Sequence, residues 1–200
     1  MVASWLWDHL LLATGLMVLV ILVLVGGLTL GWNSPRPRGC PDWEAQVLPH
    51  HLDVAPDRPT FALFDRRASD FAFEGLIQPT TLPKSALVDY GLIYRAQDID
   101  NHYAFLIGAD GYYAVMKVEG GRRTALVPWQ QFPHIGRGLE RNRLLVSCAG
   151  PVCTFRINDE YAVTVEDDRW VSGNLGIGAE SPEGEAAFTF LWAQLWLRDD

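Results

Sequence analysis

The 200-residue chain has little positive charge. It carries 16 Lys and Arg against 24 Asp and Glu, a formal net charge of −8 at pH 7. Proteins that bind nucleic acid need a basic surface to neutralise phosphates, and docking on anionic lipid needs a basic cluster. The composition therefore argues against a nucleic-acid partner and against polybasic docking on a membrane. The sequence also contains no internal repeat and no long polar tract, which argues against a solenoid and against a disordered chain.

The chain lacks the common short signatures of catalysis as well. It has no glycine-rich phosphate loop, and neither Ser147 nor His134 has a carboxylate partner in a nucleophile motif. The adjacent His50 and His51 would need further ligands to hold a transition metal, and the sequence suggests none. These patterns give no support to nucleotide, serine-hydrolase or transition-metal chemistry.

One acidic segment, Asp98 to Asn101, has the residue spacing with which a calcium-binding loop begins. The rest of an EF-hand is missing, because loop position 6 is not Gly and loop position 12 is not Glu. Asp and Asn side chains bond to their own backbone in turns, so a hairpin turn accounts for these residues. Calcium held through loops of another kind stays the alternative, and no other cofactor is expected.

Formal charge is absent from His9 to Pro35, if the histidine is neutral. The run from Leu10 to Leu30 would extend roughly 31 Å as a helix, about the thickness of a bilayer's hydrocarbon core. Indole rings favour the membrane interface, and they flank this run on both sides: Trp5, Trp7 and Trp32. We predict a transmembrane helix over residues 10–32 after a short tail, residues 1–9. The alternative is a secretory signal peptide, but the basic n-region and the small-residue cleavage pattern are missing.

Residues 33–42 are predicted to form a short, stiff linker, because Pro35 and Pro37 restrict the backbone. Arg36 and Arg38 follow the helix and no Lys or Arg precedes it, which by the positive-inside rule places the following domain in the cytoplasm. Two arginines bias the orientation in the membrane only modestly. The cysteine spacing and the family resemblance described below favour the opposite side, so we expect a single-pass membrane protein with an extracytoplasmic domain.

The chain has only three cysteines, too few for a disulfide framework in a domain of this size. Cys148 and Cys153 enclose four residues, and in a four-residue hairpin loop the flanking positions face each other. We predict that they form a disulfide, which would favour an oxidising compartment; the alternative is a pair of buried thiols. Cys40 is left over, either free or paired with another chain.

From Thr60 onward, short β-rich runs alternate with Gly, Pro, Asn and Asp turns. About eleven strands and no clear amphipathic helix predict an all-β fold, a two-sheet sandwich over residues 43–199. The closing run is apolar on both faces, so we expect it to be central or to contact something besides its own core. The candidate strands are Thr60–Phe64, Asp70–Ile77, Leu87–Ala96, Tyr103–Ile107, Tyr112–Val118, Thr124–Pro128, Asn142–Cys148, Cys153–Ile157, Tyr161–Glu166, Leu175–Ala179 and Ala186–Leu197.

Several segments in this order resemble the concanavalin A-like jelly-roll domains of bacterial membrane-associated and secreted proteins, the laminin-G-like and 3-keto-disaccharide-hydrolase-like set. The resemblance extends from Trp43 to Leu197 and implies two curved antiparallel sheets, the concave one often holding a carbohydrate or peptide. It does not imply one activity, because this fold hosts lectins, glycosidases and interaction modules. The segments are Asp89–Arg95, Gln97–Asp98, Asn101–Phe105, Asp110–Tyr113, Asn142–Leu144, Phe155–Asn158, Ser172–Ile177 and the closing strand.

A jelly-roll glucanase is expected to carry paired carboxylates on one strand, in an E-x-D-x-x-E pattern, as nucleophile and acid. That pattern is absent. Glu180, Glu183 and Glu185 lie around Pro182 in a predicted turn, and we interpret them as solvated turn carboxylates. The same interpretation applies to Asp159 and Glu160.

A binding face on the central hairpins is the remaining candidate. Strand alternation places Gly91, Ile93 and Arg95 on one side, and a charge inside a strand needs a partner or water. If that side is concave, four side chains are predicted to line a ligand groove, with aromatic rings stacking on sugars: Arg95, Tyr113, Lys117 and Trp129. The alternative is that the aromatic rings belong to the core.

The first functional hypothesis is a membrane-anchored, non-catalytic module that binds a glycan or a protein, for example as an accessory subunit of a membrane complex. A glycoside hydrolase with a diverged site is the second, and it requires carboxylates converging in one cleft. A structural stalk without a pocket is the third.

Overall fold

The computed structural model describes residues 14–19, 37, 39–45 and 50–198. Cα proximity divides the chain into two units, Met1–Arg38 and Gly39–Asp200. In the first unit residues 14–19 are helical, and no helix among the described residues is long and apolar enough to cross a membrane. Most of the predicted span 10–32, with the tail 1–9 and its tryptophans Trp5, Trp7 and Trp32, lies outside the described residues.

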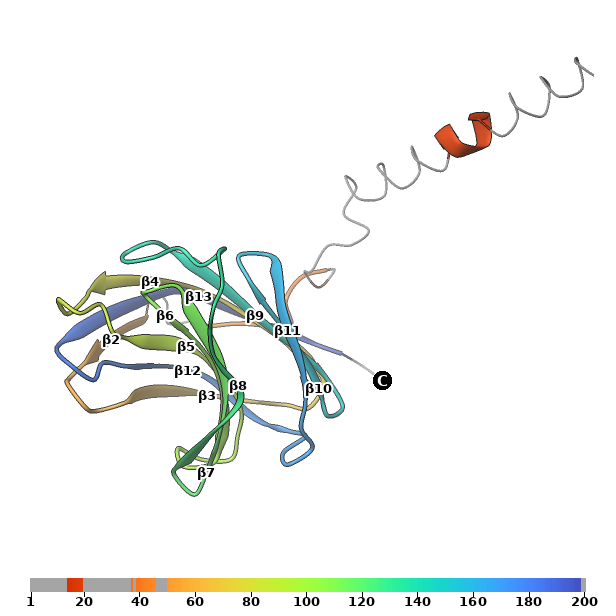
Figure 1. The fold of residues 1–200 in the computed structure, drawn as a ribbon. Coiled ribbons are helices and arrows are strands. Elements are labelled where there is room, and N and C mark those ends of the chain that lie inside the picture. Colours follow the sequence, from red (N-terminus) through yellow and green to blue (C-terminus); the bar gives the residue numbers. More distant parts are fainter. Residues whose placement is uncertain (1–13, 20–36, 38, 46–49, 199–200) are drawn as a thin grey trace, which may run out of the picture. The chain divides into compact units, whose positions relative to one another are not determined.

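The second unit is a sandwich of two antiparallel sheets, and Figure 1 shows their strands in two layers. The seven-stranded sheet has the order β1-β13-β4-β9-β10-β11, with β2 also pairing with β13. Its strands are β1 (Trp43–Glu44), β2 (His50–Val54), β4 (Phe71–Thr81), β9 (Asn142–Ala149), β10 (Val152–Ile157), β11 (Glu160–Glu166) and β13 (Ala186–Leu197). The six-stranded sheet has the order β3-β12-β5-β6-β7-β8. Its strands are β3 (Thr60–Ala68), β5 (Asp89–Ala96), β6 (His102–Gly108), β7 (Tyr112–Glu119), β8 (Arg122–Gln131) and β12 (Gly173–Glu180).

The core lies between the two sheets and follows the alternation of the strands. Tyr90 and Leu92 of β5 point inward, where Tyr90 packs against Phe188 of β13 with ring centroids 4.8 Å apart. Phe105 of β6 meets Phe155 of β10 at 4.9 Å. Complete burial of one such side chain contributes roughly 2–3 kcal/mol, so this aromatic layer is a main source of stability.

The predicted all-β, two-sheet jelly-roll-like sandwich is confirmed. The closing strand β13 is central, because β4 pairs with one edge and β1 and β2 with the other. The strands β1 and β2 were not predicted: β1 has two residues, and β2 contains two adjacent histidines that hide its alternation. Residues 132–141 form turns and coil between β8 and β9.

Cys148 of β9 and Cys153 of β10 are directly opposite in register and form a disulfide, with Cα atoms 4.1 Å apart. The pairing is therefore the one that the spacing predicted. Cys40 is a free, exposed thiol.

Loss of this disulfide is expected to lower the free energy of unfolding by about 2 kcal/mol, because the crosslinked loop is short and restricts the unfolded chain only moderately. Urea unfolding with and without reductant measures the effect. The double variant Cys148→Ser/Cys153→Ser should match the reduced protein, whereas Cys40→Ser should behave like the wild type. An unchanged midpoint after complete reduction would contradict the prediction.

Candidate functional site

The outer face of the six-stranded sheet is concave. Arg123 of β8 and Glu180 of β12 form an ion pair, although the strands β5, β6 and β7 lie between β8 and β12 in the sheet. In a flat sheet the two side chains would be too far apart, since neighbouring strands lie about 4.8 Å from each other. The sheet must therefore bend between them, and Figure 1 shows β3 and β8 running at a large angle to each other. Twist of this kind hollows one face of a sheet.

The first of two hollows on this face, called here the apolar hollow, is narrow and has room for only about 20 Å³, roughly one water molecule. Ile93, Ala104 and Leu106 form its floor, although they point away from the core. Glycine on β12 keeps the space open: a Cβ at Gly178 would lie 2.8 Å from the ring of Phe61. The rim is polar and consists of Asp89, His102, Arg123 and Glu180.

The second, called here the aromatic hollow, is larger and has room for about 280 Å³ beside the β6–β7 turn. Trp129 of β8 and Tyr112 of β7 line it with exposed rings, 38% and 39% accessible. The rest of its lining is Leu87, Val88, Asp89, Asp110 and Pro182. Exposed aromatic rings beside carboxylates suit a ligand that has an apolar face and hydroxyl groups at its edge.

Asp89 lines both hollows and is the point where they meet. The pKa of Asp89 is raised to about 7, mainly by burial and then by the charge of Glu180, its register partner on β12; Arg123 lowers the pKa and Asp110 adds a smaller increase. The carboxyl is therefore divided between its neutral and ionised forms near neutral pH, and can either donate or accept a hydrogen bond. Burial lowers the pKa of His102, which leaves its ring neutral at pH 7.

The structure does not bring the four predicted groove residues together. Trp129 lies in the aromatic hollow, but Tyr113 points into the core and its hydroxyl accepts a hydrogen bond from Gln130 Nε2 at 2.8 Å. Lys117 points to the inner side and binds Asp167. The core alternative was therefore correct for Tyr113.

Arg95 is fully buried, and it departs from the alternation that the prediction assumed. Tyr94 and Arg95 together face one residue of β12, which makes a β-bulge, and Arg95 has a φ of 50°. The bulge turns the side chain inward. Its guanidinium donates to three backbone carbonyls in three connections: Ser69 at 3.0 Å, Gly150 at 2.6 Å and Trp170 at 3.3 Å. Arg95 is thus a structural clamp at one end of the sandwich.

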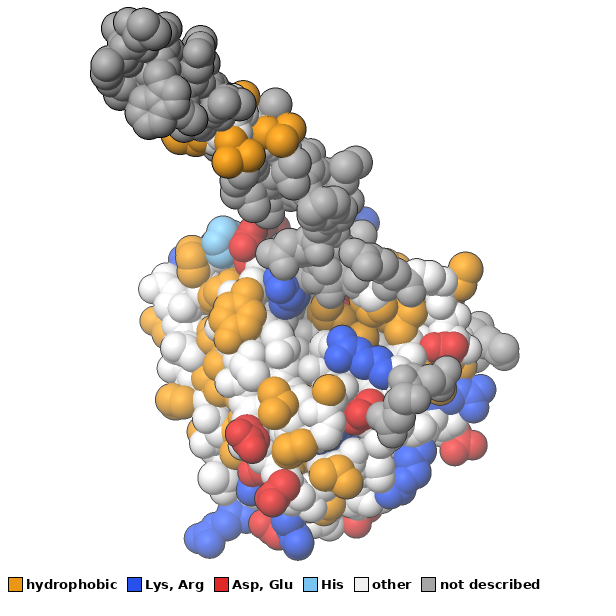
Figure 2. All heavy atoms as spheres, turned by 90° about the vertical axis from the view of Figure 1, so that its right-hand side faces the viewer, with side chains coloured by type: hydrophobic (Ala, Val, Ile, Leu, Met, Phe, Trp, Pro, Cys, Tyr) orange, Lys and Arg blue, Asp and Glu red, His pale blue; other side chains and the backbone are white. Residues whose placement is uncertain are grey.

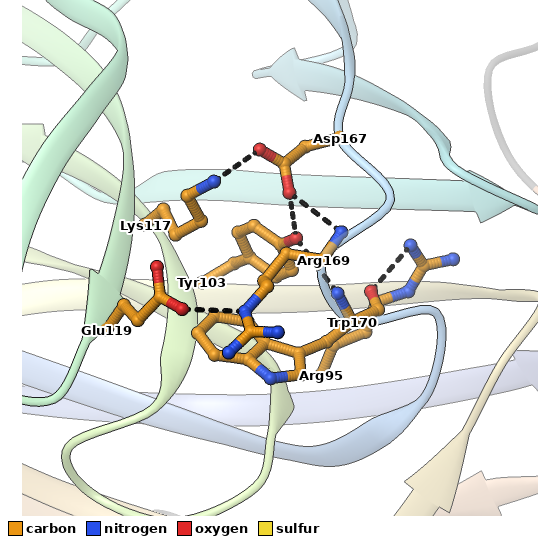
Figure 3. Close-up of polar contacts among 7 residues, drawn as sticks. All are labelled: Arg95, Tyr103, Lys117, Glu119, Asp167, Arg169 and Trp170. Atoms are coloured by element: carbon orange, nitrogen blue, oxygen red, sulfur yellow. Dashed lines mark hydrogen bonds and ion pairs between the residues drawn. The ribbon is translucent and has the colours of Figure 1, made fainter.

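A polar network next to this clamp secures the β11–β12 connection (Figure 3). The Tyr103 hydroxyl and the Arg169 backbone amide donate to Asp167 Oδ1, and Lys117 Nζ binds Asp167 Oδ2 at 2.7 Å. Burial opposes ionisation of Asp167, but the hydrogen bonds from Lys117 and Tyr103 help to outweigh it and hold its pKa below the usual value. Because each partner is satisfied within the protein, this network positions a loop.

Sequence reasoning missed the carboxylates of the concave face. Glu180 was interpreted as a solvated turn residue, but it is the last residue of β12 and only partly exposed. Glu183 and Glu185 do lie in the exposed turn. Because neighbouring residues of a strand face opposite sides, an inward Tyr113 implies that Tyr112 lies on the outer face, so Tyr112 could have been identified as a site residue from the sequence. No local pattern indicates that Asp89 and Glu180 lie opposite each other.

The acidic segment Asp98–Asn101 forms a turn closed by its own hydrogen bonds, with Asp98 accepting from the Asp100 amide and from Asn101 Nδ2. Among the described residues, no three His, Cys, Asp or Glu side chains are grouped so that they could hold a metal ion. Calcium held through loops of another kind stays an untested alternative.

Charged side chains of both signs stand close together along the lower part of the face shown in Figure 2. Hydrophobic side chains lie between them in small groups. That face therefore has the mixed polarity of an ordinary solvated surface.

Comparison with solved structures supports the fold. The carbohydrate binding module CBM66 from Bacillus subtilis is similar over 74% of this chain and 87% of its own, with a TM-score of 0.59 and 19% identity. The GH43 protein BlXynB from Bacillus licheniformis gives a TM-score of 0.57 at 12% identity, and the Bacteroides ovatus xyloglucan protein GH43B gives 0.55 at 19%; each match covers 74% of this chain and 32% of the other. No protein-family model and no curated sequence matches the chain.

Proposed function

We propose that this protein is a glycan-binding module whose ligand lies on the concave face, with a sugar ring against Trp129 and Tyr112. The observation that carries the proposal is the aromatic hollow, where two exposed rings stand beside Asp89 and Asp110. The apolar face of a pyranose packs on aromatic rings, and carboxylates bind its hydroxyls. The similar structure from Bacillus subtilis is a carbohydrate binding module, which supports the same class of ligand.

The Trp129→Ala variant is expected to bind its glycan roughly 10- to 30-fold more weakly, because it removes the larger ring from the centre of the site. A glycan array probed with the full chain in phospholipid nanodiscs identifies the ligand, and titration calorimetry gives the affinities. Tyr161→Ala is the matched control, since this ring is 53% exposed but lies on β11 of the other sheet. Absence of any glycan signal, or equal loss in both variants, would contradict the proposed site.

A specific observation also favours a second function, hydrolysis of a glycoside. A retaining glycosidase needs one carboxylic acid held protonated near neutral pH and a second, ionised carboxylate close to it. Asp89 has its pKa raised to about 7, and Glu180 stands opposite it in register while paired with Arg123. Release of reducing sugar from the glycans that bind on the array distinguishes an enzyme from a binding module.

The module is further proposed to be anchored in a membrane by residues 10–32, with the sandwich on the extracytoplasmic side. The uncharged apolar run and its flanking tryptophans support the anchor, and the disulfide supports an oxidising compartment. In this arrangement the chain could serve as an accessory subunit of a membrane complex. Carbonate extraction tests the anchor, and identification of chains that co-purify in mild detergent tests the subunit role.

A further inference from the structure

The charged side chains that line the aromatic hollow are both acidic. They are Asp89 and Asp110, and the described residues of the lining include no Lys, Arg or His. Arg123 lines the apolar hollow instead, where it is held in an ion pair. Arg137 is exposed and also outside the lining, with its Nε 2.7 Å from where a Cβ at Gly111 would lie. A ligand in this hollow therefore meets carboxyl groups that no basic side chain of the lining neutralises.

Sheet pairing brings the two carboxyl groups together. Asp89 of β5 is opposite Gly108 of β6 in register, so a side chain at position 108 would begin about 5 Å from the Cβ of Asp89. Asp110 occupies that place, because a Cβ at Gly108 would collide with Asp110 Oδ1. The backbone amide of Tyr112 donates to the same oxygen at 3.3 Å and holds this carboxylate beside Asp89. The turn after β6 thus supplies an acceptor next to the one on β5.

Neighbouring carboxylates repel each other, so each opposes ionisation of the other. The pKa of Asp89 reflects this: burial is the largest cause of its rise to about 7, Glu180 adds to it, Arg123 opposes it and Asp110 adds a smaller increase. A ligand with a positive group between Asp89 and Asp110 would relieve the repulsion and donate a charge-assisted hydrogen bond to each. An acidic sugar would increase the repulsion, and a neutral sugar would leave it unchanged.

The aromatic rings indicate an organic cation rather than a metal ion. Calcium takes roughly 6–8 oxygen ligands, and within the described part of the chain no three His, Cys, Asp or Glu side chains are grouped to hold a metal. Trp129 and Tyr112 instead offer exposed rings, which attract an ammonium group and pack against the apolar face of a pyranose. A sugar that carries a protonated amine has both parts, a face for the rings and a donor for the carboxylates.

We propose that the aromatic hollow selects a glycan with a free, protonated amino sugar, whose ring lies on Trp129 and whose ammonium group binds between Asp89 and Asp110. The inference rests on the proposed glycan-binding function and adds the class of sugar. The two carboxylates then determine specificity. They favour a hexosamine over its N-acetylated form, which has no charge, and over a uronic acid, which has a negative one.

Three β-1,4-linked glucose-type tetrasaccharides test this selectivity, because they differ only in the group at carbon 2 of each ring: an amine, an acetamide or a hydroxyl. Titration calorimetry with the full chain in phosphatidylcholine nanodiscs gives their affinities near neutral pH, with protein-free nanodiscs as the blank. The amine tetramer is expected to bind roughly tenfold more tightly than the other two, since charge-assisted hydrogen bonds are about twice as strong as neutral ones. Spermine, a linear polyamine without a sugar ring, measures attraction to the acidic protein as a whole and should bind more weakly than the amine tetramer.

Asp110→Asn removes one charge and keeps the shape of the side chain. It should reduce the preference for the amine tetramer over the hydroxyl tetramer to about twofold, because a neutral amide does not offset the ammonium charge. Asp89→Asn should reduce the preference in the same way. Asp65→Asn is the matched control, since it makes the same change in net charge at an exposed position of β3, outside the hollow, and should keep the full preference. Thermal unfolding of each variant confirms that it is folded.

Equal or weaker binding of the amine tetramer would overturn the inference and leave the glycan-binding proposal intact. The same conclusion would follow if the preference persisted in Asp110→Asn or Asp89→Asn, if Asp65→Asn also lost it, or if spermine bound as tightly as the amine tetramer. If none of the tetramers binds, the glycan array decides: bound glycans with a free amine support the inference, and bound glycans without one overturn it alone. An array without any signal overturns the proposed function as well.

Discussion

Replacement of Arg95 by methionine is expected to lower the free energy of unfolding by about 3 kcal/mol. The substitution roughly conserves volume but removes the donors for the carbonyls of Ser69, Gly150 and Trp170. A buried carbonyl left without a donor costs roughly 1–3 kcal/mol, and the three affected here are only partly buried, so each is expected to cost an amount at the low end of this range. Removing a buried charge recovers part of that loss. The expected total is therefore close to the lower limit for three carbonyls, about 3 kcal/mol.

Guanidinium unfolding followed by tryptophan fluorescence measures this change. Arg122→Met is the matched control, because Arg122 is exposed at the start of β8 and should change stability by less than about 0.5 kcal/mol. A wild-type midpoint in Arg95→Met would mean that burial of the guanidinium costs as much as its three hydrogen bonds contribute. The position would then be tolerated, and the clamp would have no net role in stability.

Between pH 5 and pH 8 the wild-type protein is expected to lose stability through Asp89. In the unfolded chain this carboxyl has its ordinary pKa of 3.8, whereas in the folded protein the pKa is about 7. The folded state therefore holds a proton that the unfolded state releases, and raising the pH through about 7 favours unfolding. The full shift would correspond to about 4 kcal/mol, of which about 2.6 kcal/mol falls between pH 5 and pH 8. The solvent contact of the side chain reduces the expected effect in this range to about 2 kcal/mol.

Asp89→Asn should remove this contribution and be the more stable protein at pH 8. The charged groups that face Asp89 remain in the variant, namely Glu180 on β12, Arg123 on β8 and Asp110 in the β6–β7 turn, and so does the titratable ring of His102 on β6. Comparison of unfolding free energies at pH 5 and pH 8, with exposed Asp65→Asn as control, isolates the effect. A pH dependence that is the same in Asp89→Asn and in wild type would show that Asp89 ionises normally in the folded protein.

Much of the fold could be predicted because strand alternation is a local property. The hairpins from Asp89 to Val118, the central closing strand and the pairing of Cys148 with Cys153 all follow from neighbours in the chain. The strands β1 and β2 could not be recognised, since they exist only through pairing with β13, more than 130 residues away.

The candidate site was predicted only at Trp129. Alternation was applied to Arg95 as though the strand were regular, but a bulge and a left-handed backbone turn that side chain into the opposite layer. A single extra residue reverses which face a side chain occupies, and β5 carries no Gly or Pro at that point to indicate it.

By itself, the sequence determined that this is an all-β, two-sheet sandwich, because the two-residue alternation of side chains along each strand is visible in consecutive residues. Only the tertiary structure decided which outer face is concave and which charges meet there. Asp89 and Glu180 are 91 positions apart, and Arg123 reaches Glu180 across three strands. Contacts between residues so far apart in sequence depend on the register and twist of every strand between them, and no local sequence pattern predicts these.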